Sequence, residues 1–242
     1  MINVIGIGPG SLDMMTYQAV KAIEESQVIV GYKTYIDLIL PLIKEKEVVS
    51  NGMRQEIERC RQAIEIAKTG KTVAVISSGD AGVYGMAGLV LELASEQGLH
   101  DMKIEIIPGV TASTAAASIL GSPLMHDFCH ISLSDLLTPI ELIYKRTELA
   151  AQADFVICFY NPRSKGRENH LRDAFELIKK HKSSDTPVGI VKNAGRENMV
   201  RTLTTLADID YSIVDMTSIV IVGNKSTYIA DDLMLTPRGY EI

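Results

Sequence analysis

The sequence predicts an α/β protein built from two α/β domains, and three observations support this prediction. In the first half of the chain, short apolar runs alternate with segments of helical spacing. Glycine-rich loops follow two of these runs, as they often do at the carboxyl ends of strands in α/β sheets. Near the end of the chain, three β signals follow one another closely, which favours antiparallel pairing. The first sheet is therefore predicted to be mostly parallel and the second sheet to be mixed.

The elements expected in the first half follow from apolar spacing and from the residues that end each run. In order, they are a strand at 2–7, a helix at 14–25, a strand at 28–31, a helix at 53–68, a strand at 71–76, a helix at 86–97, a strand at 103–107 and a helix at 110–120. Tyr17 and Ile57 are expected on the buried faces of the first two helices. Gly70 is expected just past the end of the second helix.

The run Gly121-Ser122-Pro123 marks the expected boundary between the domains, because glycine and proline interrupt regular structure. It divides the chain into 1–120 and 121–242. The elements expected after the boundary are a strand at 128–133, a helix after Pro139, a strand at 154–159, a helix at 169–181 and β signals at 188–192, 217–222 and 227–235.

Composition argues against several classes of protein. A chain of 242 residues, 46% of them hydrophobic, can form a core without disulfides or a structural metal. Its three cysteines include no Cys-x-x-Cys pair, which argues against a zinc ribbon. The net charge of −6 argues against a nucleic-acid partner. No apolar run reaches the roughly 20 residues of a membrane span, and no basic leader is visible, so we expect a cytoplasmic protein without a membrane partner.

Two glycine loops are candidates for one shared ligand site. The loop Gly6-Ile7-Gly8-Pro9-Gly10 lacks the spacing of a dinucleotide fingerprint, and no acid stands at the end of the second strand. A tight turn without a ligand explains this loop equally well. In 77–85, three glycines surround Asp80, whose carboxylate suits a ligand with hydroxyls or a positive charge. A role for Asp80 as a helix cap would explain the acid but not the glycines.

Cations gather in the loop that follows the predicted strand at 154–159. Arg163, Lys165 and Arg167 stand within five residues of one another. Arg196 and Arg238 follow later turns. A loop exposed to solvent would explain the charge by itself. The position of this loop at the carboxyl end of a strand, however, favours carboxylate binding. The planar guanidinium group matches a carboxylate in geometry.

Two further patterns each allow two interpretations. The small residues at 111–113 either permit close helix packing or leave room for a flat ring. His126 and His130 have a spacing that binds zinc on a helix. Here they fall on a predicted loop and strand, where residues four apart do not converge, so we predict no metal site and treat substrate contact as the functional alternative.

The order and spacing of 6–10, 79–85, 108–112 and 160–162 resemble the tetrapyrrole (class III) methyltransferases, which use S-adenosylmethionine. The resemblance covers essentially the whole chain. Within that family, 77–88, 126–139 and 159–167 look most similar to the branch that methylates C17 of precorrin-3B or cobalt-precorrin-3 and contracts the ring. Ala81 stands where most relatives have proline, which fits that branch.

The resemblance implies a fold of two α/β domains with a cofactor cleft between them, and a homodimer. It also implies that S-adenosylmethionine contacts nine positions of this chain. These are Pro9, Gly79, Asp80, Val83, Thr111 and Ala112 in the first domain as the family has it, and Tyr160, Asn161 and Ala194 in the second.

The implied substrate is a precorrin-3 type tetrapyrrole with many carboxylates, which we expect to bind cations. The candidates are Arg54, Arg163, Lys165, Arg167, Arg196 and Arg238. His126, His130, Asp80 and Asp135 are chemically able to move a proton, and the sequence does not choose among them. Methylation of another ring carbon or of RNA and a non-catalytic tetrapyrrole sensor remain alternatives. A nicotinamide oxidoreductase is less favoured because the ribose-binding acid is missing.

Overall fold

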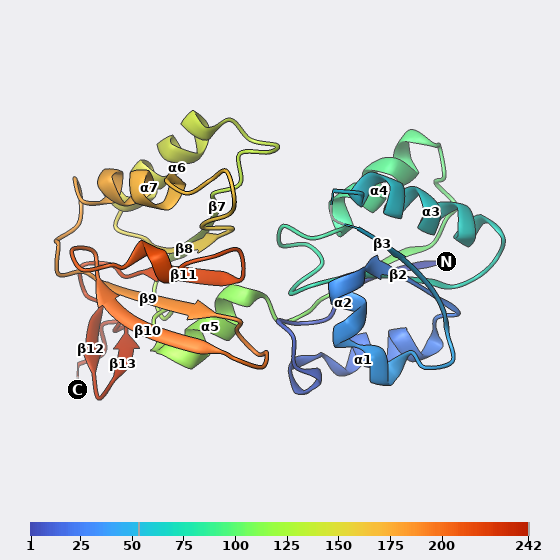
Figure 1. Cartoon of the computed structure of the whole chain (residues 1–242), viewed down its shortest axis with the longest axis horizontal. Coiled ribbons are helices and arrows are strands. Elements are labelled where there is room, and N and C mark those ends of the chain that lie inside the picture. Colours follow the sequence, from blue (N-terminus) through green and yellow to red (C-terminus); the bar gives the residue numbers. More distant parts are fainter. Residues whose placement is uncertain (53, 242) are drawn as a thin grey trace. The chain divides into compact units, whose positions relative to one another are not determined.

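The structure is a computed structural model that describes residues 1–52 and 54–241 (Figure 1). By their internal contacts, the residues form two compact units, Met1–Ala112 and Ser113–Ile242. The expected boundary at 120–121 differs from this division by one helix, α5 (Ala112–Leu120). No described helix is long and apolar enough to cross a membrane.

The first unit is built on a five-stranded sheet in the order β3-β2-β4-β1-β5. All of its strand pairs are parallel, so all five strands end at the same edge. The strands are β1 (Ile2–Gly6), β2 (Val28–Tyr32), β3 (Glu47–Asn51), β4 (Val73–Ser77) and β5 (Ile104–Ile107). The helices are α1 (Tyr17–Glu25), α2 (Lys33–Leu38), α3 (Glu56–Lys68) and α4 (Ala87–Glu96), with short 3-10 turns at Leu12–Met14 and Leu40–Leu42.

The central strands of this sheet are buried on both faces, which explains why they appear in the sequence as continuous apolar runs. Successive side chains point to opposite faces. Val4 and Val75 therefore join the core beneath α3 and α4, whereas Ile5 and Ile76 join the core beneath α1 and α2. Figure 1 shows the two helix pairs on opposite faces of the sheet.

Two elements of the first unit were missed, and two side chains were predicted wrongly. Helix α2 has only six residues, and edge strand β3 is mostly exposed, so neither has a clear apolar period. Tyr17 and Ile57 are 84% and 52% exposed, because each lies in the first turn of its helix and later turns cover the sheet. Met53, the expected first residue of the second helix, lies outside the described residues.

The second unit has a mixed sheet in the order β10-β9-β11-β8-β7. Strands β7 and β8 are parallel, and the other neighbours are antiparallel, as the sequence predicted. The strands are β7 (Phe128–Ser132), β8 (Val156–Tyr160), β9 (Pro187–Lys192), β10 (Val200–Thr205) and β11 (Ser218–Val222). The helices are α6 (Ile140–Gln152) and α7 (His170–Ile178), with a 3-10 turn at Tyr211–Ile213.

Three short strands form a separate sheet in the order β12-β13-β6. They are β12 (Tyr228–Ala230), β13 (Leu233–Leu235) and β6 (Gly121–Ser122). The single β signal expected at 227–235 is thus a hairpin. Strand β10 was not predicted, because this edge strand is exposed or only half-buried along its length.

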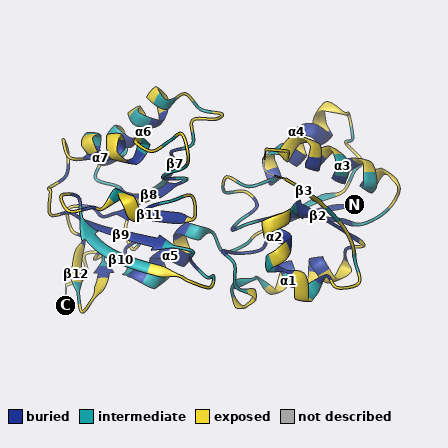
Figure 2. Cartoon of the chain, in the orientation of Figure 1, coloured by how far each residue is buried: buried dark blue, intermediate teal, exposed yellow. Residues whose placement is uncertain are grey.

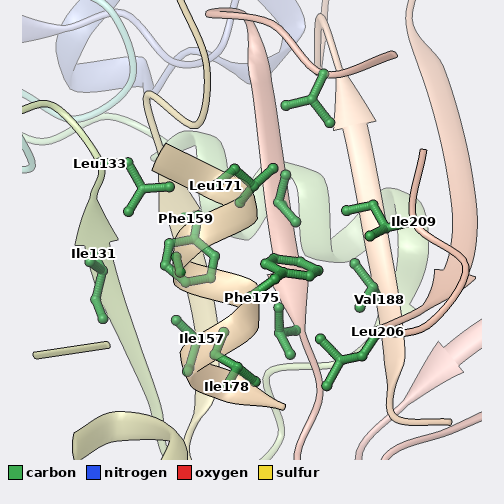
Figure 3. Packing of buried hydrophobic residues seen from close by; sticks show 14 of the residues in the cluster. Ile131, Leu133, Ile157, Phe159, Leu171, Phe175, Ile178, Val188, Leu206 and Ile209 are labelled. Atoms are coloured by element: carbon green, nitrogen blue, oxygen red, sulfur yellow. The ribbon is translucent and has the colours of Figure 1, made fainter. Parts of the chain in front are cut away.

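The core of the second unit lies between its large sheet and helices α6 and α7 (Figure 3). Phe159 of β8 and Phe175 of α7 meet there, with ring centroids 6.3 Å apart. Helix α5 packs on the sheet as well, since a Cβ built on Gly189 would lie 2.4 Å from Leu120 Cδ1. Figure 2 shows buried strands beside helices whose outer faces are exposed.

Candidate functional site

The two glycine loops of the first unit are hydrogen-bonded to each other beyond the sheet edge. Gly8 N–H donates to the carbonyl oxygen of Gly79 at 3.0 Å, and Gly79 N–H donates to that of Gly8 at 2.8 Å. Gly79 has a φ of +67°, which favours glycine. The two loops therefore lie side by side, as one shared ligand site would require.

A third loop, the one after β5, joins this surface at Gly109. A Cβ built on Gly109 would lie 2.2 Å from the carbonyl oxygen of Gly79 and 2.6 Å from Gly6 C and O. A Cβ on Gly79, in contrast, would meet only Thr111 Cα and Ala112 N, at 3.8 and 3.7 Å. The three loops thus pack backbone against backbone, and a Cβ at Gly79 would be in ordinary van der Waals contact with the start of α5.

Asp80 holds two of these loops together. Its Oδ1 accepts a hydrogen bond from Gly82 N–H at 2.8 Å, and its Oδ2 accepts one from Gly109 N–H at 3.0 Å. Helix α4 begins only at Ala87, so Asp80 does not cap it. A carboxylate has about four acceptor positions. The half-buried Asp80 therefore retains acceptor capacity for the hydroxyl groups of a ligand.

The six first-unit candidates for cofactor contact gather at the carboxyl ends of β1, β4 and β5. Pro9 is buried just beyond Gly8, and half-buried Val83 donates its N–H to the carbonyl oxygen of Asp80 at 3.4 Å. Thr111 and Ala112 are half-buried and adjoin Gly79. The structure thus brings together residues that are more than a hundred positions apart in the sequence.

A second group of polar side chains lies at one edge of the large sheet of the second unit. Strands β8 and β9 are both antiparallel to β11, and β7 is parallel to β8. The carboxyl ends of β7, β8 and β9 therefore share this edge. Tyr160 is the last residue of β8 there, Asn161 follows it, and buried Ala194 follows β9.

Tyr160 is fixed by contacts with α5 and β7. Its hydroxyl oxygen accepts a hydrogen bond from Ser113 N–H at 3.0 Å, and its ring centroid lies 5.2 Å from that of His130. His130 Nε2 lies 2.8 Å from Ser113 Oγ. Burial lowers the pKa of His130, which favours a neutral ring at pH 7. Asn161, at a φ of +50°, donates from Nδ2 to Ser132 Oγ at 3.0 Å.

The candidate cations differ in how firmly they are held. Arg163 Nη1 donates to the carbonyl oxygen of Tyr211 at 2.8 Å, and both residues line a cavity of about 380 Å³. Arg167 is 11% exposed at its side chain and donates from Nε to Ser164 Oγ at 2.8 Å. Lys165, between them, is exposed.

The remaining candidates lie on other elements. Arg196 follows β9 and is half-buried, so it shares the sheet edge with Tyr160. Arg54 is exposed in the first unit beyond β3, with a φ of +63°, and exposed Arg238 follows β13. The structure thus brings four of the six predicted cations to one sheet edge: Arg163, Lys165, Arg167 and Arg196.

His126 and His130 are not arranged as a pair. His126 is exposed, and its Nδ1 accepts a hydrogen bond from Asp127 N–H at 2.9 Å, whereas His130 points to Ser113. Within residues 1–52 and 54–241, no group of three or more His, Cys, Asp or Glu side chains is placed to hold a metal ion.

Comparison with known proteins identifies the family. Residues 1–210 match the model of the tetrapyrrole (corrin/porphyrin) methylases. The chain belongs to this family. The tetrapyrrole methylase is 62% identical over 242 residues to the probable cobalt-factor III C(17)-methyltransferase of Salmonella typhimurium, with 100% of both chains covered.

Two further relatives of this tetrapyrrole methylase support the same relationship. The precorrin-3B C(17)-methyltransferase of Sinorhizobium sp. is 39% identical, with 99% of this chain and 96% of the relative covered. The crystal structure of the methyltransferase CobJ superimposes with a TM-score of 0.93 at 35% identity, covering 98% of this chain and 99% of that one. The predicted α/β class, with a parallel first sheet and a mixed second sheet, is confirmed.

The contacts of several polar residues of this tetrapyrrole methylase were not predicted. Ser132 and Ser113 bond to Asn161 and His130, and Asp135 lies near Arg167 and His170. Ser132 was detectable in principle, because it lies near the end of the strand predicted at 128–133. The contact between Asp135 and His170 was not, since it depends on how the loop after β7 folds.

Proposed function

We propose that this chain transfers a methyl group from S-adenosylmethionine to C17 of cobalt-factor III, in the biosynthesis of cobalamin. The observation that carries this proposal is the 62% identity, over the full length of both chains, to a relative that bears the name of this activity. The relative named for precorrin-3B is 39% identical, which favours the cobalt-containing ring over the metal-free ring as substrate. Contraction of the ring, implied by the family resemblance, is part of the proposal.

The residues of the first unit fit S-adenosylmethionine, which supplies an activated methyl group. Gly79 lies next to Thr111 and Ala112, and Asp80 has acceptor capacity for hydroxyls. We infer that Pro9 and Val83 line the same site and that Thr111 and Ala112 hold the methionine end. Tyr160, Asn161 and Ala194 of the second unit are proposed to contact the adenosine.

The chain's own contribution to the reaction is binding and orientation. The methyl group is already activated, so the protein must align the ring carbon with it and exclude water. Arg163, Lys165 and Arg196 are proposed to bind the carboxylates of the ring, and Arg167, Arg54 and Arg238 to contribute at its periphery. A neutral His130, bonded to Ser113, is able to accept a proton, but no side chain is assigned as acid or base.

One property of the whole protein is also proposed: a homodimer. Light scattering after gel filtration measures the oligomeric state, and a monomer at micromolar concentration would contradict the dimer.

Incubation of the purified protein with S-adenosylmethionine and cobalt-factor III, under reducing conditions without oxygen, tests the function. A carbon-13 label on the donated methyl shows by NMR which ring carbon receives it. We expect a product with one added methyl at C17, and a lower yield from metal-free precorrin-3B. A label at another carbon would reassign the site of methylation. Binding of S-adenosylhomocysteine and of the ring without any methylated product would favour a sensor.

A further inference from the structure

Two loops at the carboxyl edge of the second sheet are joined to each other. Residues 133–139 follow β7, and residues 161–169 follow β8. Leu133 N–H donates to the carbonyl oxygen of Tyr160 at 2.9 Å, and His170 Nδ1 lies 3.1 Å from the carbonyl oxygen of Leu133. The loop after β7 is thus held at its base by the last residue of β8 and the first residue of α7, which flank the cation-bearing loop.

Asp135 extends this attachment along the loop. Its carboxylate lies 4.0 Å from Arg167 Nε and 3.8 Å from His170 Nε2. Arg167 also donates from Nη2 to Met216 Sδ at 3.4 Å, and its Nη1 is buried without a hydrogen-bond partner among the described residues. The chain immediately after Asp135 is therefore anchored on one side.

The next two residues are apolar and exposed. Leu136 is 68% exposed and Leu137 is 98% exposed, and Met216 beside Arg167 is 46% exposed. Water is an unfavourable environment for such side chains. These leucines follow Asp135, whose carboxylate lies beside Arg167, so the loop that carries them is attached to a loop that carries cations. Exposed apolar residues on such a loop suit a ligand with an apolar body and anionic groups.

We propose that Leu136 and Leu137 contact the apolar face of the tetrapyrrole, while Arg163 and Lys165 bind its carboxylates. This inference rests on the proposed function. A tetrapyrrole has both the flat apolar face and the ring of negative charges that this surface complements. Asp135 is a positioning residue, because it holds the loop through its contacts with Arg167 and His170. Its own negative charge would repel the carboxylates of the ring.

The test is a titration of cobalt-factor III into the full-length protein without oxygen, followed by absorbance. Leu137→Ser changes a side chain that is almost fully exposed, so it should leave the free protein folded. We expect a Kd for the ring at least about tenfold above that of the unsubstituted protein, since loss of a few methylene contacts has effects of this size. In the methylation assay, KM should rise more than kcat falls.

Leu149→Ser is the matched control, because Leu149 is 53% exposed on α6 and outside both loops. It should leave the Kd for the ring unchanged. S-adenosylhomocysteine affinity, measured by calorimetry, should be the same in all three proteins.

Three outcomes would overturn the inference. An unchanged Kd in Leu137→Ser would remove the leucines from the substrate surface while leaving the proposed function intact. An unchanged Kd together with a shift in oligomeric state would assign them to a contact between subunits. Failure of the unsubstituted protein to bind the ring, although S-adenosylhomocysteine binds, would overturn the proposed function as well.

Discussion

At the scale of single residues, three glycines determine the surface beside the first sheet. Gly6, Gly79 and Gly109 bring three loops into backbone contact, with no room for a Cβ on Gly6 or Gly109. This contact sets the position of the Gly109 N–H that donates to Asp80. The local backbone thus arranges the carboxylate before any ligand binds.

Gly109→Ala should destabilise the protein, whereas Gly88→Ala should not. The new Cβ at 109 would meet only backbone atoms within 2.6 Å, so we expect a loss of about 3 kcal/mol in the free energy of unfolding. Gly88 is exposed in α4 with nothing within 4 Å of its Cβ position, and alanine there should add about 0.5 kcal/mol. Urea denaturation measures both, and equal effects would contradict the packing argument.

Asp80→Ala should weaken binding of S-adenosylhomocysteine by about tenfold or more, while the protein stays folded. The substitution leaves two backbone N–H groups without their acceptor, which should lower the free energy of unfolding by about 1–2 kcal/mol. Calorimetry measures the affinity. Asp101→Ala, at an exposed position of the same unit, is the control. If the affinity of Asp80→Ala for S-adenosylhomocysteine is unchanged, Asp80 has only a structural role.

At the scale of elements, the sequence predicted best the strands that are buried on both faces. In β4 and β8, continuous apolar runs end in glycine or polar loops, and these signals are local. Short α2 and edge strands β3 and β10 have no such signal. The hydrogen bond between Gly109 and Asp80 could not be predicted from the sequence either, because it depends on how two separate loops pack.

Helix α5 packs with the second unit, which has a consequence for fragments of the chain. Ser113 N–H bonds to Tyr160, Leu120 lies against Gly189, and Arg201 Nη1 donates to the carbonyl oxygen of Ile119. We therefore expect a fragment of 113–242 to unfold at a higher urea concentration than a fragment of 121–242. Circular dichroism follows both transitions, and equal midpoints would favour the boundary at 120–121.

At the scale of the whole molecule, buried thiols make stability depend on pH. Burial raises the pKa of Cys60 from 9.0 to about 12 and that of Cys129 to about 11. Above pH 9, an unfolded thiol loses its proton while the buried one keeps it. The stability that these two protonated thiols contribute to the folded protein is therefore complete below pH 9, and it is lost as the pH rises toward 11 or 12.

Cys60→Ala isolates this effect, since other titrating groups are common to both proteins. At pH 7.5 the variant should be less stable by a fixed packing cost. Between pH 9 and 11 the difference in free energy of unfolding should shrink, because only the unsubstituted protein carries the penalty of keeping Cys60 protonated. Urea titrations at several pH values measure it. A constant difference would show that the folded and unfolded thiols titrate alike.

The pairing of β13 with β6 has a consequence for synthesis on the ribosome. Met234 and Leu235 lie beside Gly121 and Ser122, so two segments from the opposite ends of the second unit form one small sheet. The first unit has all five of its strands once Ile107 has emerged, whereas the second must wait for β13. A nascent chain can therefore complete its first half early, while its second half stays open to chaperones until residue 235 has emerged.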